Sequence, residues 1–480
     1  MLHGIIDIDR NSPVSLSEQI YRQIRFAVRD GKLKTGQRLT SSRNFARQLN
    51  VSRNVVSLAY DLLKAEAIIT VKNGAAPIIS KPEDPVKNRT SSGAQVKRLS
   101  APTLSKRGQA LCIDPRAGLK SSHHGHLAPG EPALDIFPTE SWARCLRRVS
   151  RTVSPAAYLY QNVSGQPELQ SVLAEHLLDM RGIRTAPGNI LITTTTQASI
   201  TLISQCLTDP GEAVFLENPG YLGARGSFQS AGLKSLALPV NRKGASLPRS
   251  MPAQQAKLIY LTPSHQFPLG HTLSLSRRLD FIDYARRENA LILEDDYDSE
   301  FLFSGRPVAA MQALAPDCVI YMGTFSKTML PGLRLAYMVV PPELSARLSQ
   351  AIRNMGMMAS VPIQLAMRDF ITSGHYRAHI RHIRHIYKHR GETLFAGLKE
   401  ALGETVKLTP PTGGVQLSVQ FMDMRDDKTL ASRLQAQGVN VTALSSTYLK
   451  QPKSGLIIGF ADAKPENIER SITAIKKVLA

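Results

Sequence analysis

The sequence predicts two structural classes in one chain, a small α+β unit followed by a large α/β unit, and three observations lead to this prediction. The 480 residues exceed one ordinary domain, and 42% of them are hydrophobic, which is enough for buried cores. Helical periodicity and one hairpin signal fill residues 1–80. From residue 126 onward, short apolar strand-like runs alternate with helical patterns.

The positive charge of the chain is concentrated near its N-terminus. The chain has 59 Lys and Arg against 38 Asp and Glu, a net charge of +21. Residues 1–80 hold 12 basic and 6 acidic residues, and residues 81–120 hold 9 and 3, so each segment carries +6 and the other 360 residues carry +9. A polyanionic partner such as nucleic acid is therefore expected, although charge alone does not identify it.

Hydropathy and cysteine content exclude several classes of protein. No apolar run reaches the 18 or so residues of a membrane span, and residues 1–10 lack the apolar stretch of a signal peptide. The four cysteines are far apart and form no C-x-x-C pair, which argues against a disulfide scaffold or a cysteine zinc site. We expect a cytoplasmic protein without a membrane partner.

Three amphipathic segments predict the helices of the small unit. Residues 16–29 place apolar side chains on one face, and a second helix is expected over residues 41–49 with Ser41 or Ser42 as its N-cap. A third helix begins at Ser52 after a turn of three or four residues, which completes a helix-turn-helix. Polar residues at the start of the third helix can reach base edges, and the second helix can contact phosphate, so the candidate DNA-binding residues here are Arg43, Ser52, Arg53 and Asn54.

Residues 68–79 read as two short strands around a turn at Asn73-Gly74, and Gly74 is a further candidate DNA contact. The unit resembles the winged helix-turn-helix of the GntR superfamily through the segments GKLKTGQRL, SSRNFA, VSRNVV and AYDLL. Three features depart from the family pattern: Thr40 replaces a proline, Ala67 replaces a glycine, and the wing ends in AAPIIS. The wing is therefore expected to differ more than the helices.

Six apolar runs predict the strands of an α/β fold with a largely parallel sheet. They span residues 189–193, 212–217, 257–262, 290–295, 318–324 and 335–340. Polar residues follow four of these runs, and ligands collect at the carboxyl ends of strands in such sheets. Hydroxyls and amides before a helix can bind an anion such as a phosphate. An aspartate can pair with a protonated ring nitrogen, and a lysine can form a Schiff base. Pyridoxal phosphate requires all three of these groups.

The strand-end motifs resemble those of the MocR-type (GabR-like) regulators, in which a GntR winged helix is fused to a fold-type I aminotransferase-like domain. The matching segments are ENPGYLGARGSF, TPSHQFPLG, EDDYDSEF and YMGTFSKTMLPGLRLAYMVVPP. The resemblance implies that Lys327 forms the internal aldimine with pyridoxal 5′-phosphate. It implies that Asp295 pairs with the pyridine nitrogen, that Tyr297 bonds the phenolic oxygen and that Tyr221 stacks on the ring. The phosphate would be held by Thr195, Thr196, Gln197, Thr324 and Arg334.

Spacing alone does not choose between Asp295 and Asp296, and the family position selects Asp295. Other positions depart from ordinary aminotransferases: Phe267 replaces an asparagine that touches the cofactor, residues 160–165 read YQNVSG, and Thr195 replaces a glycine. Residues 455–461 (GLIIGFA) contain no arginine where many aminotransferases bind a substrate carboxylate. We therefore expect the chain to bind the cofactor, whereas the departures argue against turnover as an aminotransferase.

A histidine-rich segment at residues 374–390 predicts a helix with three distinct faces, one apolar, one of Arg and Lys and one of His. Histidines at helical spacing can bind a transition metal. The neighbouring cations and the absence of an acid in the segment oppose this, so no metal site is expected. We interpret the segment as a basic helix packed at a domain or subunit boundary.

The predicted organisation is a DNA-binding domain at residues 1–80, a basic flexible linker at 81–125 and an aminotransferase-like domain at 126–480. Its large subdomain spans about 155–340 and its small subdomain mainly 341–480. The predicted protein is a transcriptional regulator that binds a double-stranded operator, as a head-to-tail homodimer. It would sense an amine, an amino acid or a vitamer through aldimine exchange at Lys327. One alternative is an active aminotransferase with an appended DNA-binding module, and another is a scaffold that has lost the cofactor.

Overall fold

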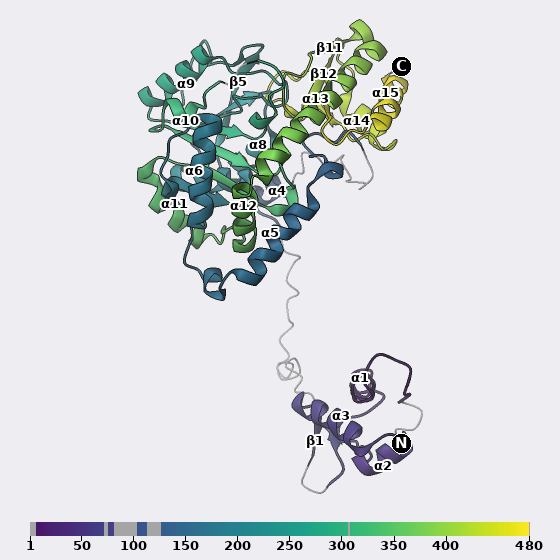
Figure 1. Ribbon diagram of the computed structural model, residues 1–480. Coiled ribbons are helices and arrows are strands. Elements are labelled where there is room, and N and C mark those ends of the chain that lie inside the picture. Colours follow the sequence, from purple (N-terminus) through teal and green to yellow (C-terminus); the bar gives the residue numbers. More distant parts are fainter. Residues whose placement is uncertain (1–5, 72–74, 81–102, 113–125, 306–307, 480) are drawn as a thin grey trace, which may run out of the picture. The chain divides into compact units, whose positions relative to one another are not determined.

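The computed structural model describes residues 6–71, 75–80, 103–112, 126–305 and 308–479. Its contacts divide the chain into two compact units, Met1–Pro102 and Thr103–Ala480 (Figure 1). Each unit is described by itself.

In its described residues, the first unit contains three helices and a two-stranded antiparallel sheet. Its elements are α1 (Leu16–Arg29), α2 (Ser42–Gln48), α3 (Arg53–Ala65), β1 (Ile69–Thr70) and β2 (Ile78–Ile79). Each helix begins after a serine whose side chain accepts a backbone N–H of the first turn, and these N-caps are Ser15, Ser41 and Ser52. The apolar faces of the three helices form one core. The helix-turn-helix prediction is confirmed, with Ser41 as the cap of α2.

The helices of the second unit are α4 (Lys106–Cys112), α5 (Thr139–Thr152), α6 (Pro167–Arg181), α7 (Thr196–Leu207), α8 (Leu222–Ser230), α9 (Leu275–Arg287), α10 (Met311–Leu314), α11 (Pro342–Asn354), α12 (Val361–Thr372), α13 (His375–Leu402), α14 (Asp427–Gln435) and α15 (Pro465–Leu479). Its strands are β3 (Ile190–Thr193), β4 (Ala213–Asn218), β5 (Lys234–Asn241), β6 (Gly244–Ala245), β7 (Ala256–Leu261), β8 (Leu291–Asp296), β9 (Val319–Thr324), β10 (Ala336–Val339), β11 (Val406–Leu408), β12 (Gln416–Phe421), β13 (Thr442–Ala443) and β14 (Gly455–Gly459).

Eight of these strands form one large sheet in the order β3-β10-β9-β8-β7-β4-β5-β6. The strands β5, β4, β7, β8 and β9 are parallel, whereas β10 runs antiparallel to both of its neighbours, β3 and β9. The predicted α/β class is confirmed, and every predicted run contains a strand. Two strands at one edge, β5 and β6, were not predicted.

The small sheet has the order β11-β12-β14-β13 and is antiparallel throughout. The long helix α13 contacts α12 at the large-sheet side and α15 and β11 at the small-sheet side, and Figure 1 shows it running between the two groups of elements. Its buried residues include Tyr376, Ile380, Ile383 and Tyr387, the apolar face that the sequence predicted.

Part of the expected linker is structured. Residues 106–112 form helix α4, which contacts α8 in the second unit. The flexibility of the remaining linker stays a prediction, because most of residues 81–125 lie outside the described ranges. In the described ranges, no helix has both the length and the apolar character needed to cross a membrane.

Candidate functional site

The carboxyl ends of four strands meet at one edge of the large sheet. Strands β4, β8 and β9 are parallel, and β3 has the same direction because β10 is antiparallel to both β3 and β9. The loops after these strands carry most of the residues that the sequence singled out as cofactor ligands. Topology therefore gathers groups as far apart in the chain as Thr195 and Arg334, which are 139 positions apart.

Lys327 lies just after β9, and its amine contacts a turn from a distant part of the chain. The Nζ atom donates a hydrogen bond of 2.5 Å to the carbonyl oxygen of Gly130. Gly130 has a φ of +77°, and a Cβ atom added there would lie 3.0 Å from the Lys327 Nζ. Glycine is thus required both by the left-handed backbone and by the close approach of the lysine. Gly130 was not among the predicted site residues.

Asp295 and Asp296 are adjacent at the end of β8, yet their environments differ. The Asp296 carboxylate forms an ion pair of 2.8 Å with Arg181 and accepts hydrogen bonds from Tyr321 and Ser299. Burial alone would raise its pKa, but these partners hold the pKa of Asp296 below its usual value. The ion pair and both hydrogen bonds of Asp296 are therefore made with protein side chains.

Asp295 retains an oxygen available for a ligand. Its Oδ2 accepts a 2.5 Å hydrogen bond from the hydroxyl of Tyr260, whereas its Oδ1 is buried without a hydrogen-bond partner among the described residues. Burial raises the pKa of Asp295 to about 7, against the lowering effects of the Tyr260 hydrogen bond and of Lys327. The Oδ1 of Asp296 is also buried without a hydrogen-bond partner among the described residues, so the two carboxyls differ in the ion pair of Asp296 with Arg181 and in the opposite directions of their pKa shifts. Asp295 as the partner of the ring nitrogen stays a prediction.

The start of α7 provides a helix N-terminus beside the same edge. Thr195 is the N-cap, and its Oγ1 accepts a 3.0 Å hydrogen bond from the backbone N–H of Ala198. Thr196 and Gln197 are the first two helical residues, so their N–H groups are among those left unpaired within the helix. A Cβ atom added to Gly223 would lie 2.5 Å from the Tyr221 hydroxyl and 2.7 Å from Gln197 Nε2, so these two side chains lie side by side.

Three further predicted ligands occupy nearby loops. The Thr324 Oγ1 is 3.0 Å from the Ser326 Oγ. The hydroxyl of Tyr297 donates a 3.1 Å hydrogen bond to the carbonyl oxygen of His265. Arg334 has an exposed side chain and a φ of +50°, in the left-handed region. The roles assigned to these residues and to Lys327 stay predictions.

Sequence reasoning missed Tyr260 and the buried pair of His265 and Asp298. The His265 Nδ1 lies 2.9 Å from the Asp298 Oδ1, and both residues are more than nine-tenths buried. Tyr260 lies inside an apolar run, where an aromatic residue is ordinarily a core residue. Its position at the carboxyl-terminal part of β7, beside β8, was the one available signal.

The candidate DNA-binding residues of the first unit lie at or near helix starts. Arg43 is in the first turn of α2, and Ser52, Arg53 and Asn54 cap or begin α3; all four are exposed. A hydrogen bond of 2.7 Å from the Tyr60 hydroxyl to the Thr40 carbonyl ties α3 to the segment before α2. Gly74 lies outside the described residues.

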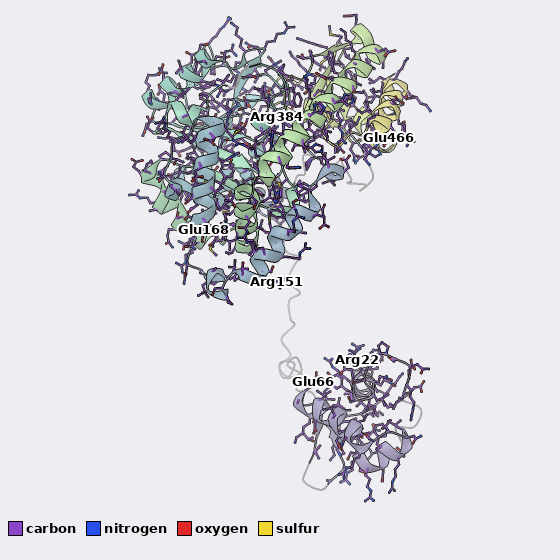
Figure 2. The ribbon with its side chains drawn as sticks, in the orientation of Figure 1. Arg22, Glu66, Arg151, Glu168, Arg384 and Glu466 are labelled. Atoms are coloured by element: carbon purple, nitrogen blue, oxygen red, sulfur yellow. The ribbon has the colours of Figure 1, made fainter. Side chains whose placement is uncertain are left out.

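The histidine-rich helix α13 has a partly buried basic face. Arg384, labelled in Figure 2, donates a 2.7 Å hydrogen bond to the carbonyl oxygen of Glu300, and Arg377 and Arg381 are exposed. His379 is buried, with its Nε2 2.8 Å from the Thr328 carbonyl oxygen. Across the described ranges, His, Cys, Asp and Glu side chains form no cluster of three or more suited to a metal ion.

Two family models match the chain. The model for aminotransferase class I and II matches residues 126–475, and the model for bacterial regulatory proteins of the gntR family matches residues 16–78. The chain is 36% identical to the probable rhizopine catabolism regulatory protein MocR of Rhizobium meliloti, over 98% of this chain and 94% of that protein. It is 29% identical to the pyridoxine biosynthesis transcriptional regulator PdxR of Corynebacterium glutamicum, over 99% of this chain and 98% of that protein.

Solved structures resemble the second unit. The α-aminoadipate aminotransferase of Thermus thermophilus, crystallised with N-(5′-phosphopyridoxyl)-L-leucine, is 25% identical with a TM-score of 0.72, covering 78% of this chain and 97% of that one. The kynurenine aminotransferase of Pyrococcus horikoshii is 27% identical with a TM-score of 0.71, covering 78% and 96%.

Proposed function

The chain belongs to the MocR-type transcriptional regulators, in which a gntR-family domain is joined to an aminotransferase class I and II domain, and from this premise we propose that it senses a small amino compound at Lys327. In this proposal the first unit binds an operator in double-stranded DNA. The second unit binds pyridoxal 5′-phosphate and the effector, and the state of the Lys327 amine determines operator binding or promoter activation.

The residues at the strand ends fit the cofactor. Asp295 Oδ1 is a buried carboxylate oxygen without a hydrogen-bond partner among the described residues, which is unfavourable unless a donor approaches it. The protonated ring nitrogen is such a donor. The start of α7, with Thr195, Thr196 and Gln197, suits the phosphate, and Tyr221 lies beside it to cover the ring.

When bound, the cofactor supplies an aldehyde carbon that condenses with primary amines and a ring that withdraws electrons from the attached carbon. The protein groups orient and protonate it. Asp295 would hold a proton on the ring nitrogen, and Arg334 would supply positive charge for the phosphate. Tyr297 and Thr324 would redirect their hydroxyl hydrogens from His265 and Ser326 to the cofactor. Lys327 provides the amine that an effector amine displaces, and its release would free it from its fixed position beside Gly130.

The observation that carries this proposal is the buried Asp295 carboxyl, whose Oδ1 has no hydrogen-bond partner among the described residues and whose charge interacts with that of Lys327. The test is the visible absorbance of the protein reconstituted with pyridoxal phosphate. We expect a band in the wild type that Lys327→Ala abolishes completely, while Lys327→Ala retains the thermal melting of the cofactor-free protein, which verifies that the variant folds. A wild type without the band after reconstitution would refute the sensor and leave the second unit as a scaffold.

Two further features are part of the proposal. A symmetric operator requires two DNA-binding units, and we propose a head-to-tail homodimer. The consecutive side chains of Tyr158, Leu159 and Tyr160 are 41%, 57% and 75% exposed, which is consistent with a surface that a second copy covers. We place the protein in the cytoplasm, where its operator lies.

A working aminotransferase is the second candidate. The chain is 28% identical to the 2-aminoadipate transaminase of Thermus thermophilus over 67% of this chain, and Lys327 follows β9 with its amine in the site described above. Steady-state amino transfer between common amino donors and 2-oxo acids distinguishes the two. Multiple turnovers that Lys327→Ala abolishes would support the enzyme, whereas a single spectral change without turnover supports the sensor.

A further inference from the structure

A turn from the start of the second unit lies between Lys327 and the small sheet. The backbone N–H of Gly459, on β14, donates a 2.9 Å hydrogen bond to the carbonyl oxygen of Leu127. Three residues later, the carbonyl oxygen of Gly130 accepts from Lys327. A Cβ atom on Gly459 would lie 2.1 Å from the Ala128 carbonyl oxygen, so the turn is pressed against β14. The reactive amine is therefore next to the ends of the central small-sheet strands.

Gln416 begins β12 at this place, directly opposite Gly459. It is 9% exposed, and its Nε2 is buried without a hydrogen-bond partner among the described residues. The position of a Cβ atom on Gly130 is 3.9 Å from the Gln416 Oε1 and 3.0 Å from the Lys327 Nζ. The end of the Gln416 side chain and the Lys327 amine therefore both lie close to the same point of the turn.

A buried N–H donor without an acceptor is unfavourable, so this donor is suited to a ligand that brings an oxygen atom. The charges nearby argue that this oxygen is uncharged. Glu131 follows Gly130 directly, and burial together with the nearby charge of Glu131 raises the pKa of Asp462, three residues after Gly459, to about 7. The neighbouring Arg390 is held by Asp135 at 2.7 Å and by the carbonyl oxygen of Ala461.

A carboxylate on the effector would therefore lie near acids, and residues 455–461 of β14 and its flank offer it no arginine. An ether, hydroxyl or amide oxygen accepts the same hydrogen bond without this repulsion. The charges of the described residues thus favour a neutral oxygen on the effector over a carboxylate.

We propose that Gln416 determines effector specificity: its Nε2 donates to an uncharged oxygen on a primary amine bound at Lys327, so the effector is an oxygenated amine rather than an amino acid. This inference rests on the proposed sensing function. It extends that function by naming the chemical class of the effector and the residue that selects it.

The test uses the full-length protein loaded with pyridoxal phosphate and three probes of similar size. These are 2-methoxyethylamine, n-butylamine, which replaces the oxygen by CH₂, and 3-aminopropanoate, which carries a carboxylate. Dissociation constants come from the change in visible absorbance, and binding to DNA upstream of the gene is a second readout. We expect the wild type to bind 2-methoxyethylamine about 10-fold more tightly than either of the others.

Gln416→Met keeps the length of the side chain and removes the donor. We expect it to reduce the preference for 2-methoxyethylamine over n-butylamine to less than about 2-fold. Gln420→Met is the matched control, because Gln420 is on the same face of β12, roughly 13 Å along the strand, and should keep the wild-type preference. Equal thermal melting of both variants verifies that they fold.

Three results would overturn the proposal. One is an unchanged preference in Gln416→Met, and another is tighter binding of 3-aminopropanoate than of 2-methoxyethylamine by the wild type. The third is a Gln416→Met variant that changes the pH dependence of the absorbance but keeps the wild-type preference among amines. In that case the Gln416 amide would donate its hydrogen bond to the cofactor rather than to the effector. If the absorbance band is present but no amine changes it, amine sensing itself fails.

Discussion

The two units place their functional groups in opposite environments. In the first unit, Arg43, Ser52, Arg53 and Asn54 are exposed and come from two consecutive helix starts. In the second unit, Asp295 and Asp296 are buried, and their partners come from α6, β7 and β9. Exposed groups interact through screened charge, whereas buried groups depend on each other because water cannot replace a missing partner. Substitutions in the two units should therefore have different sizes and different consequences.

The largest effect on stability is expected from Arg181→Met in the second unit. This change leaves the buried Asp296 carboxylate without its cation, which should lower the free energy of unfolding by about 3–5 kcal/mol. Trp142, the single tryptophan of the chain, is buried in the second unit, so its fluorescence during urea unfolding reports on this unit. The control is Arg286→Met, because Arg286 and Asp317 are 49% and 55% exposed and their pair should contribute less than about 1 kcal/mol.

Asp295→Asn isolates the contribution of the buried Asp295 carboxyl to the pH dependence of stability in the cofactor-free protein. The pKa of Asp295 is about 7 in the folded state, above its usual 3.8, so folding retains a proton that the unfolded chain releases. Stability from this group is full below pH 4 or so and is lost as the pH rises toward 7. Between pH 4 and 8, the wild type should lose roughly 2–4 kcal/mol more than Asp295→Asn. Parallel profiles of urea unfolding for the two proteins would contradict this.

Arg53→Ala should weaken operator binding by about 1–3 kcal/mol without changing the fold of the first unit. Arg53 is exposed at the first position of α3, where its side chain can reach DNA. Fluorescence anisotropy with DNA from the upstream region measures the affinity at fixed salt concentration. Arg22→Ala is the control, since Arg22, labelled in Figure 2, is exposed on α1 and pairs with Glu18 at 2.7 Å. Equal losses in both variants would remove α3 as the recognition helix.

Ser52→Ala should have the smallest effect, a loss of about 1 kcal/mol in the stability of the first unit. The Ser52 side chain accepts the N–H of Val55 at 3.4 Å and satisfies one unpaired donor of α3. Hydrogen exchange of the α3 amides measures the change, and Ser52→Asp should restore it. A loss of stability as large as that expected for Arg181→Met would show that the side chains of the first unit depend on one another as strongly as the buried groups of the second.

The fold was predictable where the pattern is local. Strands β3, β4, β7, β8, β9 and β10 match the predicted apolar runs to within a residue or two at each end, because buried strands require continuous apolar residues. Strand β5 was missed because its side chains are mostly half-exposed and include Ser235, Pro239 and Asn241, a composition that does not indicate a strand. Helix α4 was missed because seven residues give too little periodicity.

The site was predictable in its chemistry but not in its partners. Spacing left Asp295 and Asp296 equivalent, since neighbouring residues of a strand point to opposite faces and the sequence does not say which face holds Arg181. Gly130 and Gln416 are 197 and 89 positions away from Lys327 in the chain, so their proximity depends on how the small sheet packs. No local pattern records such a contact.

The continuous helix α13 couples a movement at one end of the second unit to a larger displacement at the other. Its 28 residues span about 42 Å at 1.5 Å per residue, without a proline to interrupt them. One end packs beside the strand-end loops and the other supports the small sheet. A tilt of about 5° at the first end would move the other by roughly 4 Å, the size of a side-chain contact. A tilt of this size at the first end would thus be enough to displace the small sheet and, with it, Gln416.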